Sequence, residues 1–152
     1  MTYWDKKLIR EQLDDKLDKI RPLAFLSMES GWIKVIREAL SMSTKQLGKK
    51  VGIDQSRISR LENAEIEGDL KLSSLKKIAE GLNMRLVYCF VPEESLEEMM
   101  ENQAKAIAQK RMNNVNQTMR LEDQELSEKE KAKALEDLTQ RILIDEPKDF
   151  WD

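Results

Sequence analysis

The sequence predicts a mainly α-helical protein with one short β-strand, and three observations support this fold class. Only five Gly and three Pro occur in 152 residues, and charged residues make up 36% of the chain, a composition that favours long helices. Residues 43–63 carry apolar side chains at a helical spacing. Residues 84–91 form the one run typical of a strand, because both of its alternating faces are largely apolar.

Helices are expected over most of the chain that precedes this strand. Residues 5–20 predict a first helix. Its apolar face would consist of Leu13, Leu17 and Ile20. A hinge at Gly31 leads into a helix over 32–40, and a further helix is expected over 73–81. These helices would form a compact bundle over 31–82, and because so small a core is marginal alone, the flanking segments should pack on it.

The stretch 43–63 has the spacing of a helix-turn-helix, in which two helices cross at a sharp angle. Five apolar residues fall at the positions that such helices bury, namely Leu47, Val51, Ile53, Ile58 and Leu61. Gly48 falls where the two helices approach too closely for a large side chain. Gly52 falls where the first helix ends and the turn needs a residue tolerant of positive φ.

Capping residues fit the same register. Ser43 with Gln46 three residues later is a capping-box pattern for the first motif helix, and Asp54 is placed to cap the second. An ordinary helical hairpin would also need a glycine turn and an apolar stripe. The agreement of apolar, glycine and cap positions in one register favours the DNA-binding motif.

This stretch, with LKLSSLKKIAEGL after it, resembles the helix-turn-helix of the Xre family, the phage-repressor-like regulators. In that family the second motif helix lies in the major groove of double-stranded DNA and reads bases from its N-terminal part. The resemblance implies base contacts by Gln55, Ser56, Arg57 and Arg60, among which Gln suits adenine and Arg suits guanine. It implies phosphate contacts by Thr44 and Asn63, with positive charge added by Lys45, Lys49 and Lys50. Many members have Gln at the position of Thr44.

The charge distribution agrees with this interpretation. The whole chain has 26 basic and 29 acidic side chains, a net charge of −3, which is not the balance of a general nucleic-acid binder. Residues 32–60 hold seven basic and two acidic groups, net +5, whereas residues 93–152 hold nine basic and sixteen acidic groups, net −7. A solvated helical face could carry the same local excess, so the motif decides between the two interpretations.

Composition also excludes several functions. The chain has no His, which removes Ser-His-Asp and Cys-His catalysis and the commonest metal sites. Its single Cys permits no internal disulfide, and Cys89, within the run MRLVYCFVP, is expected to be a buried small hydrophobe. The N-terminus does not resemble a signal peptide, and no apolar run could span a membrane. We therefore expect a cytoplasmic protein that is not an enzyme and holds no cofactor or metal.

The predicted strand raises the question of its partner. It would comprise Arg85, Leu86, Val87, Tyr88, Cys89 and Phe90. No second strand is visible, and an unpaired strand leaves its backbone hydrogen bonds unmade. Pairing with the same strand of a second copy would give a homodimer with two DNA-reading helices, suited to a pseudo-palindromic operator. The alternative is a short extended segment packed on its own domain.

The last 60 residues predict two helices. Residues 94–119 have apolar side chains every three to five positions, and Ser127 with Glu130 predicts the start of a second amphipathic helix. The second apolar face would consist of Leu135, Leu138 and Ile142. These two stripes could close on each other or on a dimer, or they could form a groove for a partner. The final DFWD would be either a docking tip or a frayed end.

A more specific resemblance covers residues 8 to about 112. The order LDDKLDKIRPL, GWIKVIREALSMSTKQLGKKVG and IAEGLNMRLVYCFVP resembles the family called mobile mystery protein A. That family is similar to antitoxin-like regulators on mobile elements and is encoded beside mobile mystery protein B, which has a Fic domain. The resemblance therefore implies a Fic-domain toxin, encoded by the adjacent gene, as a partner. The inhibitory Ser/Thr-x-x-x-Glu-Gly/Asn helix of many Fic regulators is not present, because Ile58 and Lys76 stand where a hydroxyl is required.

The sequence thus divides into four parts. They are an N-terminal helix and hinge over 1–30, a helix-turn-helix domain over 31–82, a dimerisation strand over 83–92, and a helical extension for dimer or partner binding over 93–152. Two functional hypotheses follow. One is a sequence-specific transcriptional regulator that represses its own operon, and the other is an antitoxin that neutralises a toxin by direct contact.

Overall fold

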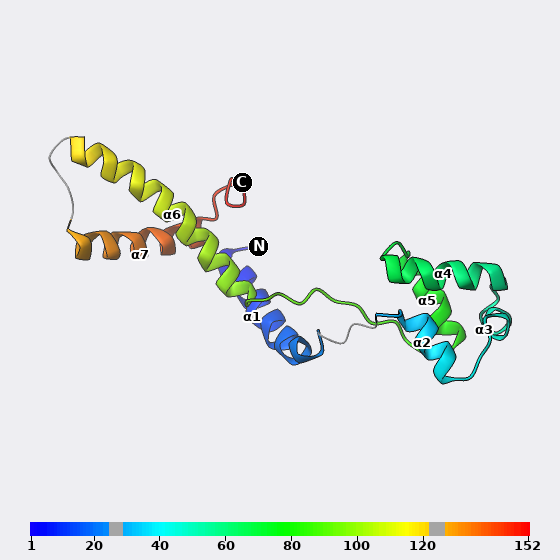
Figure 1. Cartoon of the computed structure of the whole chain (residues 1–152). Helices are drawn as coiled ribbons and strands as arrows, with labels where there is room; N and C mark the ends of the chain where they lie inside the picture. Colours follow the sequence, from blue (N-terminus) through cyan, green and yellow to red (C-terminus); the bar gives the residue numbers. More distant parts are fainter. Residues whose placement is uncertain (25–28, 122–126) are drawn as a thin grey trace. The chain divides into compact units, whose positions relative to one another are not determined.

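The computed structural model describes residues 1–24, 29–121 and 127–152, so residues 25–28 of the expected hinge lie outside it. The described residues form seven α-helices and one 3-10 helix, and no β-strand (Figure 1). They are α1 (Tyr3–Ile20), η1 (Arg21–Leu23), α2 (Trp32–Ala39), α3 (Thr44–Val51), α4 (Gln55–Glu67), α5 (Leu72–Gly81), α6 (Leu96–Leu121) and α7 (Glu128–Asp145). The mainly α fold class is confirmed.

The chain divides into two compact units. The central unit comprises Leu23–Phe90, and the terminal unit comprises Met1–Pro22 together with Val91–Asp152. The flanking segments, which the sequence predicts to pack on the central bundle, pack on each other.

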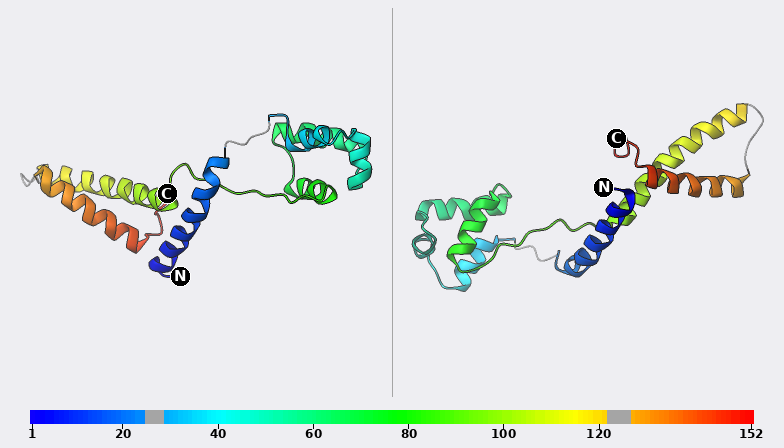
Figure 2. Two further views of the ribbon diagram at one scale, coloured as in Figure 1. Left: turned by 90° about the horizontal axis from the view of Figure 1, so that it is seen from below. Right: turned by 180° about the vertical axis from the view of Figure 1, so that it is seen from behind.

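The core of the central unit lies between α2, α3, α4 and α5 (Figure 2). Its buried side chains are Ile33, Leu47, Val51, Ile53, Ile58, Ile78 and Leu82. Four of the five apolar residues expected from the motif spacing are therefore buried, and Leu61 packs against the cluster partly buried. This confirms the crossing of the two motif helices.

The turn between α3 and α4 has the geometry that its glycines predict. Gly52 ends α3 with φ of 72°, in the left-handed region that favours glycine. A Cβ at Gly48 would lie 2.4 Å from the carbonyl oxygen of Ile53, so only the absent side chain allows this approach. Ser43 and Gln46 form the predicted capping box, and Asp54 caps α4 by accepting the N–H of Ser56.

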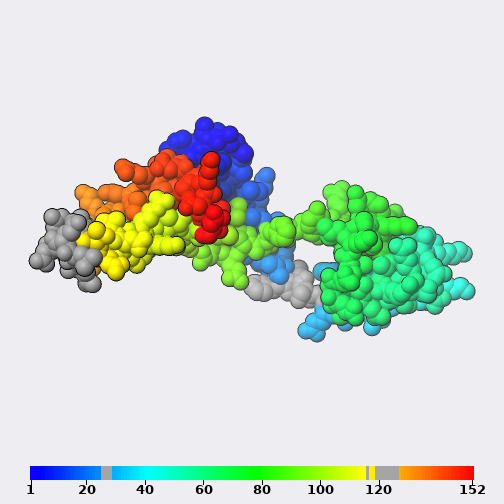
Figure 3. Space-filling view, turned by 90° about the horizontal axis from the view of Figure 1, so that it is seen from above, coloured from blue at the N-terminus to red at the C-terminus, as the bar shows by residue number. Residues whose placement is uncertain are grey.

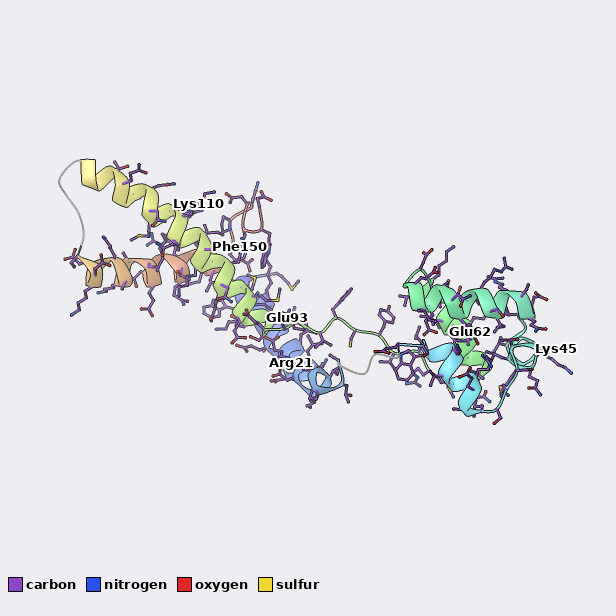
Figure 4. All side chains as sticks on the ribbon, in the orientation of Figure 1. Arg21, Lys45, Glu62, Glu93, Lys110 and Phe150 are labelled. Carbon is purple, nitrogen blue, oxygen red and sulfur yellow. The ribbon has the colours of Figure 1, made fainter. Side chains whose placement is uncertain are left out.

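Two carboxylates of α4 hold α2 in place. Glu65 accepts hydrogen bonds from the backbone N–H of Trp32 and of Ile33, each at 2.9 Å, at the start of α2. Those donors have no cap of their own, because the N-cap residue is Gly31. One turn away, Glu62 accepts from Nε of Arg37 at 2.6 Å (Figure 4 labels Glu62).

The Arg37–Glu62 pair is largely buried, with side-chain exposures of 12% and 9%. Arg37 also donates to the carbonyl oxygen of Met42 at 2.9 Å, so it ties α2 to α4 and to the loop before α3. The hydrogen bond with Glu62 raises the pKa of Arg37 above its ordinary value. Arg37, one of the seven basic groups in 32–60, therefore does not contribute to an exposed basic face.

The terminal unit is built on an antiparallel helix pair. Helices α6 and α7 pack on each other at an angle, and α1 lies beside α6 (Figure 2). The C-terminal residues, red in Figure 3, lie against α6. The buried residues of its core are Ala104, Ala108, Ile142, Leu143 and Phe150. The two C-terminal apolar stripes thus close on each other, which is one of the two arrangements that the sequence leaves open. Phe150 corrects the expectation for DFWD, because it is only 4% exposed and belongs to the core.

Helix α1 joins this unit through polar contacts. Its buried Asp14 accepts the N–H of Leu96 at 2.7 Å and of Glu97 at 3.2 Å, at the start of α6. Arg10 donates from Nε to Glu97 at 2.8 Å, and Lys6 pairs with Glu146 after α7. The predicted apolar face of α1 is wrong in part, because Leu13 is 40% exposed while Leu17 and Ile20 are half-buried.

Residues 84–90 are extended but form no strand, so the predicted dimer strand is not found. The physical reason is that the described part of this single chain offers no second strand to pair with. The N–H of Met84 bonds to the carbonyl oxygen of Ala79 at 2.8 Å, and residues 85–90 make no backbone–backbone bond to the described residues. Only Leu86 is half-buried, and Cys89, expected to be buried, is exposed.

Candidate nucleic-acid interface

The N-termini of α3 and α4 lie together, and this places a predicted phosphate contact beside a predicted base reader. The side-chain amide nitrogen of Gln55, the first residue of α4, donates to Oγ1 of Thr44, the first residue of α3, at 3.2 Å. Gln55 is exposed and Thr44 is half-buried. Thr44 thus accepts one of the two amide N–H groups of Gln55. The second N–H and the side-chain carbonyl oxygen of Gln55 remain for a base edge.

One face of α4 is buried in the core and the opposite face is open. Ile58 and Glu62 are buried, with Leu61 and Glu65 half-buried beside them. The exposed residues of α4 include every predicted DNA contact on this helix, namely Gln55, Ser56, Arg57, Arg60 and Asn63. At 100° per residue, Ser56, Arg60 and Asn63 lie on the same side of the helix, opposite the core. Gln55 and Arg57 flank this row.

Ser59 is a further candidate DNA contact that the sequence pattern did not predict. It is exposed on α4, one turn from Ser56 and from Asn63, and its hydroxyl can donate to or accept from a base or a phosphate. The signal that could have found it is the helical spacing of three and four residues from the other contacts.

Ser56 has a second function in this geometry. Its backbone N–H and its hydroxyl both donate to Oδ2 of Asp54, the cap of α4. The hydroxyl bond above all, and then the backbone bond, lower the pKa of Asp54 from its ordinary value. Because the hydroxyl proton is engaged by Asp54, the Ser56 oxygen has only acceptor capacity left, which would fit an amino group of adenine or cytosine.

The cations around this surface are exposed. Lys45, Lys49 and Lys50 of α3 extend from the bundle (Figure 4 labels Lys45), and Arg57 and Arg60 extend from α4. None of these five forms a salt bridge with a residue that the structure describes. Lys49 and Lys50 also lie in the last turn of α3, where positive charge stabilises the helix dipole. They are therefore available to phosphate oxygens without losing an internal partner.

No helix in the described residues has the length and apolarity needed to cross a membrane. The same residues contain no group of three His, Cys, Asp or Glu side chains that could hold a metal ion.

A comparison with protein families agrees with this geometry. A model of the helix-turn-helix family matches residues 33–89, which span α2 to α5 and the extended segment. Searches of curated proteins and of solved structures gave no significant match. The fold, the capped and glycine-turned motif and the family match together support a DNA-binding transcriptional regulator of the helix-turn-helix class.

Proposed function

We propose that this protein is a sequence-specific transcriptional regulator that represses its own operon. The observation that carries the proposal is the exposed face of α4, whose polar and cationic side chains lie opposite its buried face and beside the exposed lysines of α3. In a helix-turn-helix, this is the face that enters the major groove. The proposal includes no catalytic step and no cofactor.

The side chains divide into two roles. Gln55, Ser56, Arg57 and Arg60 read base edges from the first two turns of α4. The phosphate contacts are Thr44, Lys45, Lys49, Lys50 and Asn63, which fix the register of the helix on the duplex. Thr44 serves both roles, because in addition to its phosphate contact it accepts a hydrogen bond from the amide of the base reader Gln55.

The regulator is proposed to act in the cytoplasm as a homodimer on a pseudo-palindromic operator. Two copies related by a two-fold axis would present two α4 helices to successive turns of the major groove. A dimer has twice as many DNA contacts as one copy. This raises its affinity for DNA into the range of specific regulators, although the surface of each copy is small.

Two substitutions separate base reading from phosphate binding. Arg60→Ala should cost roughly 1 to 3 kcal/mol on the operator and relax specificity at one base pair, while Lys49→Ala should weaken all sequences alike and reduce the salt dependence. The measurement is a gel shift on the DNA upstream of the gene and on random DNA, at several salt concentrations. If Arg60→Ala weakened both DNAs equally, base reading by Arg60 would be excluded.

A second candidate function is that of an antitoxin with DNA binding in a secondary role. It is favoured by exposed apolar side chains on α1 and just before it in the terminal unit, where Met1 is 86%, Trp4 65% and Leu8 55% exposed. The proposed partner is the Fic-domain toxin of the adjacent gene, and one chain could combine both functions. Co-purification of the full chain with the neighbouring gene product tests this role, and loss of the complex in Trp4→Asp would assign it to α1. A neighbouring gene unrelated to any toxin would exclude the role.

A further inference from the structure

An open apolar groove lies in the central unit beside the extended segment 84–90. It has a volume of about 350 Å³, and its lining includes Trp32 and Ile36 of α2, Leu75 of α5, and Met84 and Leu86 of the segment. Trp32 and Met84 are 46% and 41% exposed, so the described residues of the central unit leave the groove open. Exposed aromatic and sulfur-containing side chains around a concave apolar surface are typical of an interaction site.

Val87 also borders this groove, and the residues after it project apolar side chains that contact little. Val87 is 78%, Tyr88 69% and Phe90 93% exposed. In an extended chain, alternate residues share a face, so Tyr88 and Phe90 lie on the same side as Leu86, the half-buried residue that faces the domain. Their backbone groups are also unpaired within the described chain.

We propose that this groove is filled by Phe90 of a second copy of the chain, within an antiparallel pair of the two segments centred on Val87. The proposal rests on the proposed regulator acting as a dimer, and it names the surface that makes the dimer. In this register Val87 faces the partner's Val87, and Met84 lies opposite the partner's Phe90. Directly opposite residues share a face, so the partner's Phe90 lies beside Met84, which borders the groove.

The pairing is self-complementary. Each segment borders an open groove near Met84 and carries an exposed aromatic residue, Phe90, at its end. Antiparallel pairing brings Phe90 of each copy to Met84 of the other. The two-fold axis then makes both contacts at once, as an isologous interface requires. The pairing also satisfies the backbone donors and acceptors along the inner edge of 85–90, which make no backbone–backbone bond to the described residues of the single chain.

Charge favours a second copy as the occupant. Residues 86–92 form an uncharged run in a chain in which 36% of residues are charged. The single charge of the segment, Arg85, lies opposite the partner's Cys89, so no like charges oppose each other. Pro92, which lacks a backbone N–H, lies outside the paired residues.

Cysteine cross-linking tests the register, because Cys89 is the only cysteine. In the full-length chain, Val87→Cys combined with Cys89→Ser should form a disulfide-linked dimer under diamide, since facing residues on the axis are within disulfide reach. The wild-type protein should not cross-link, because Cys89 and the partner's Cys89 are offset by four residues, about 13 Å. Met84→Cys with Phe90→Cys, also in Cys89→Ser, should cross-link as well.

Sedimentation of the full chain at micromolar concentration tests the groove. Phe90→Asp should weaken the dimer by roughly 100-fold or more, because each dimer loses two apolar anchors. Folding of the central unit is not at risk, since Phe90 is 93% exposed. Trp151→Asp, at a 62% exposed residue of the terminal unit, is the matched control and should leave the dimer intact.

The outcomes separate this inference from the regulator itself. A monomeric wild type that still prefers operator half-sites over random DNA would overturn the inference and leave the regulator standing. Dimers that cross-link through Cys89 but not through Val87→Cys would also overturn it. A dimer with the stated cross-links but no preference for operator DNA would support the interface and refute the proposed function.

Discussion

The central and terminal units reach a stable core by different routes. The central unit takes its core from one continuous stretch, in which seven buried aliphatic residues fall between Ile33 and Leu82. The terminal unit joins the two ends of the chain around two alanines and three larger residues, Ile142, Leu143 and Phe150. A core with large side chains can hold a reading surface rigidly, whereas the second core depends more on the polar contacts around it.

Both units nevertheless cap a helix with a carboxylate from another helix. Glu65 caps α2 across 33 residues of sequence, and Asp14 caps α6 across 82. In each case the acceptor lies on a neighbouring helix, so the bond holds two elements together while it satisfies the free N–H groups at a helix start. Five substitutions test how far the two units depend on contacts between distant parts of the chain.

The largest effect is expected from Arg37→Ala in the central unit. The substitution leaves Glu62 buried without its cation, which should cost about 3 to 5 kcal/mol of the free energy of unfolding. Hydrogen exchange should show the loss in α2, α3 and α4, while α6 and α7 keep their protection. Glu38→Ala is the control, since Glu38 lies 3.6 Å from Arg37 with a 57% exposed side chain and should contribute little. Equal loss of protection in α7 would show that the two units unfold as one.

Phe150→Ala should have a smaller effect, of about 3 kcal/mol, and it should act on the terminal unit. The ring is 4% exposed and packs in the cluster with Ala104 and Ala108, so its removal leaves a cavity that small neighbours cannot fill. Denaturant unfolding measured by hydrogen exchange in α6 and α7 checks this. Trp151→Ala, one residue further, should change stability by less than about 0.5 kcal/mol. If both variants behaved alike, Phe150 would not be a core residue.

The contrast between Phe150 and the helix-turn-helix shows what the sequence can predict. Caps, glycine turns and apolar spacing act within a few residues, so Ser43, Gly52 and Asp54 and the buried face of α4 could be predicted correctly. Phe150 sits between acidic residues at the end of the chain, and its burial depends on where α6 places Ala104. No local pattern carries that information.

The same reasoning explains the errors within the candidate site. Arg37 resembles the surface cations in sequence, and only the position of Glu62 on α4 shows that it is buried. Cys89 lies in an apolar run that resembles a core strand, but a strand needs a partner that the local sequence does not provide. The predicted DNA contacts on α4 are all exposed, and this exposure could be predicted because they lie away from the buried face of one helix.

Asp14→Asn and Glu65→Gln compare the two caps directly. Asp14→Asn should cost about 1 to 2 kcal/mol, because the amide keeps the shape but loses the charge that interacts with the start of α6. Glu65→Gln should cost less, since Glu65 is half-buried whereas Asp14 is 9% exposed. The hydrogen-exchange rates of the Leu96 and Glu97 amides measure the loss in Asp14→Asn, and those of the Trp32 and Ile33 amides measure the loss in Glu65→Gln. A larger effect of Glu65→Gln would reverse the comparison and make the central unit the one that depends on its cap.

The smallest effect on stability, and the most informative for the site, is expected from Thr44→Val. The substitution keeps the shape of Thr44 and removes the acceptor for the amide of Gln55, so the free energy of unfolding should change by less than about 0.5 kcal/mol. Discrimination at the base pair that Gln55 reads should fall by roughly three- to tenfold, because the amide is no longer held in one orientation.

A double-mutant cycle separates this positioning role from a phosphate contact by Thr44. If Thr44 acts through Gln55, Thr44→Val in a Gln55→Ala background should not change base discrimination any further. If Thr44 only contacts a phosphate, the loss should be the same on all sequences and should persist in that background, with a shallower salt dependence. Because the hydrogen bond joins the first residues of α3 and α4, the first result would show that the central unit orients its readers by contacts between helices, as it orients α2 through Glu65.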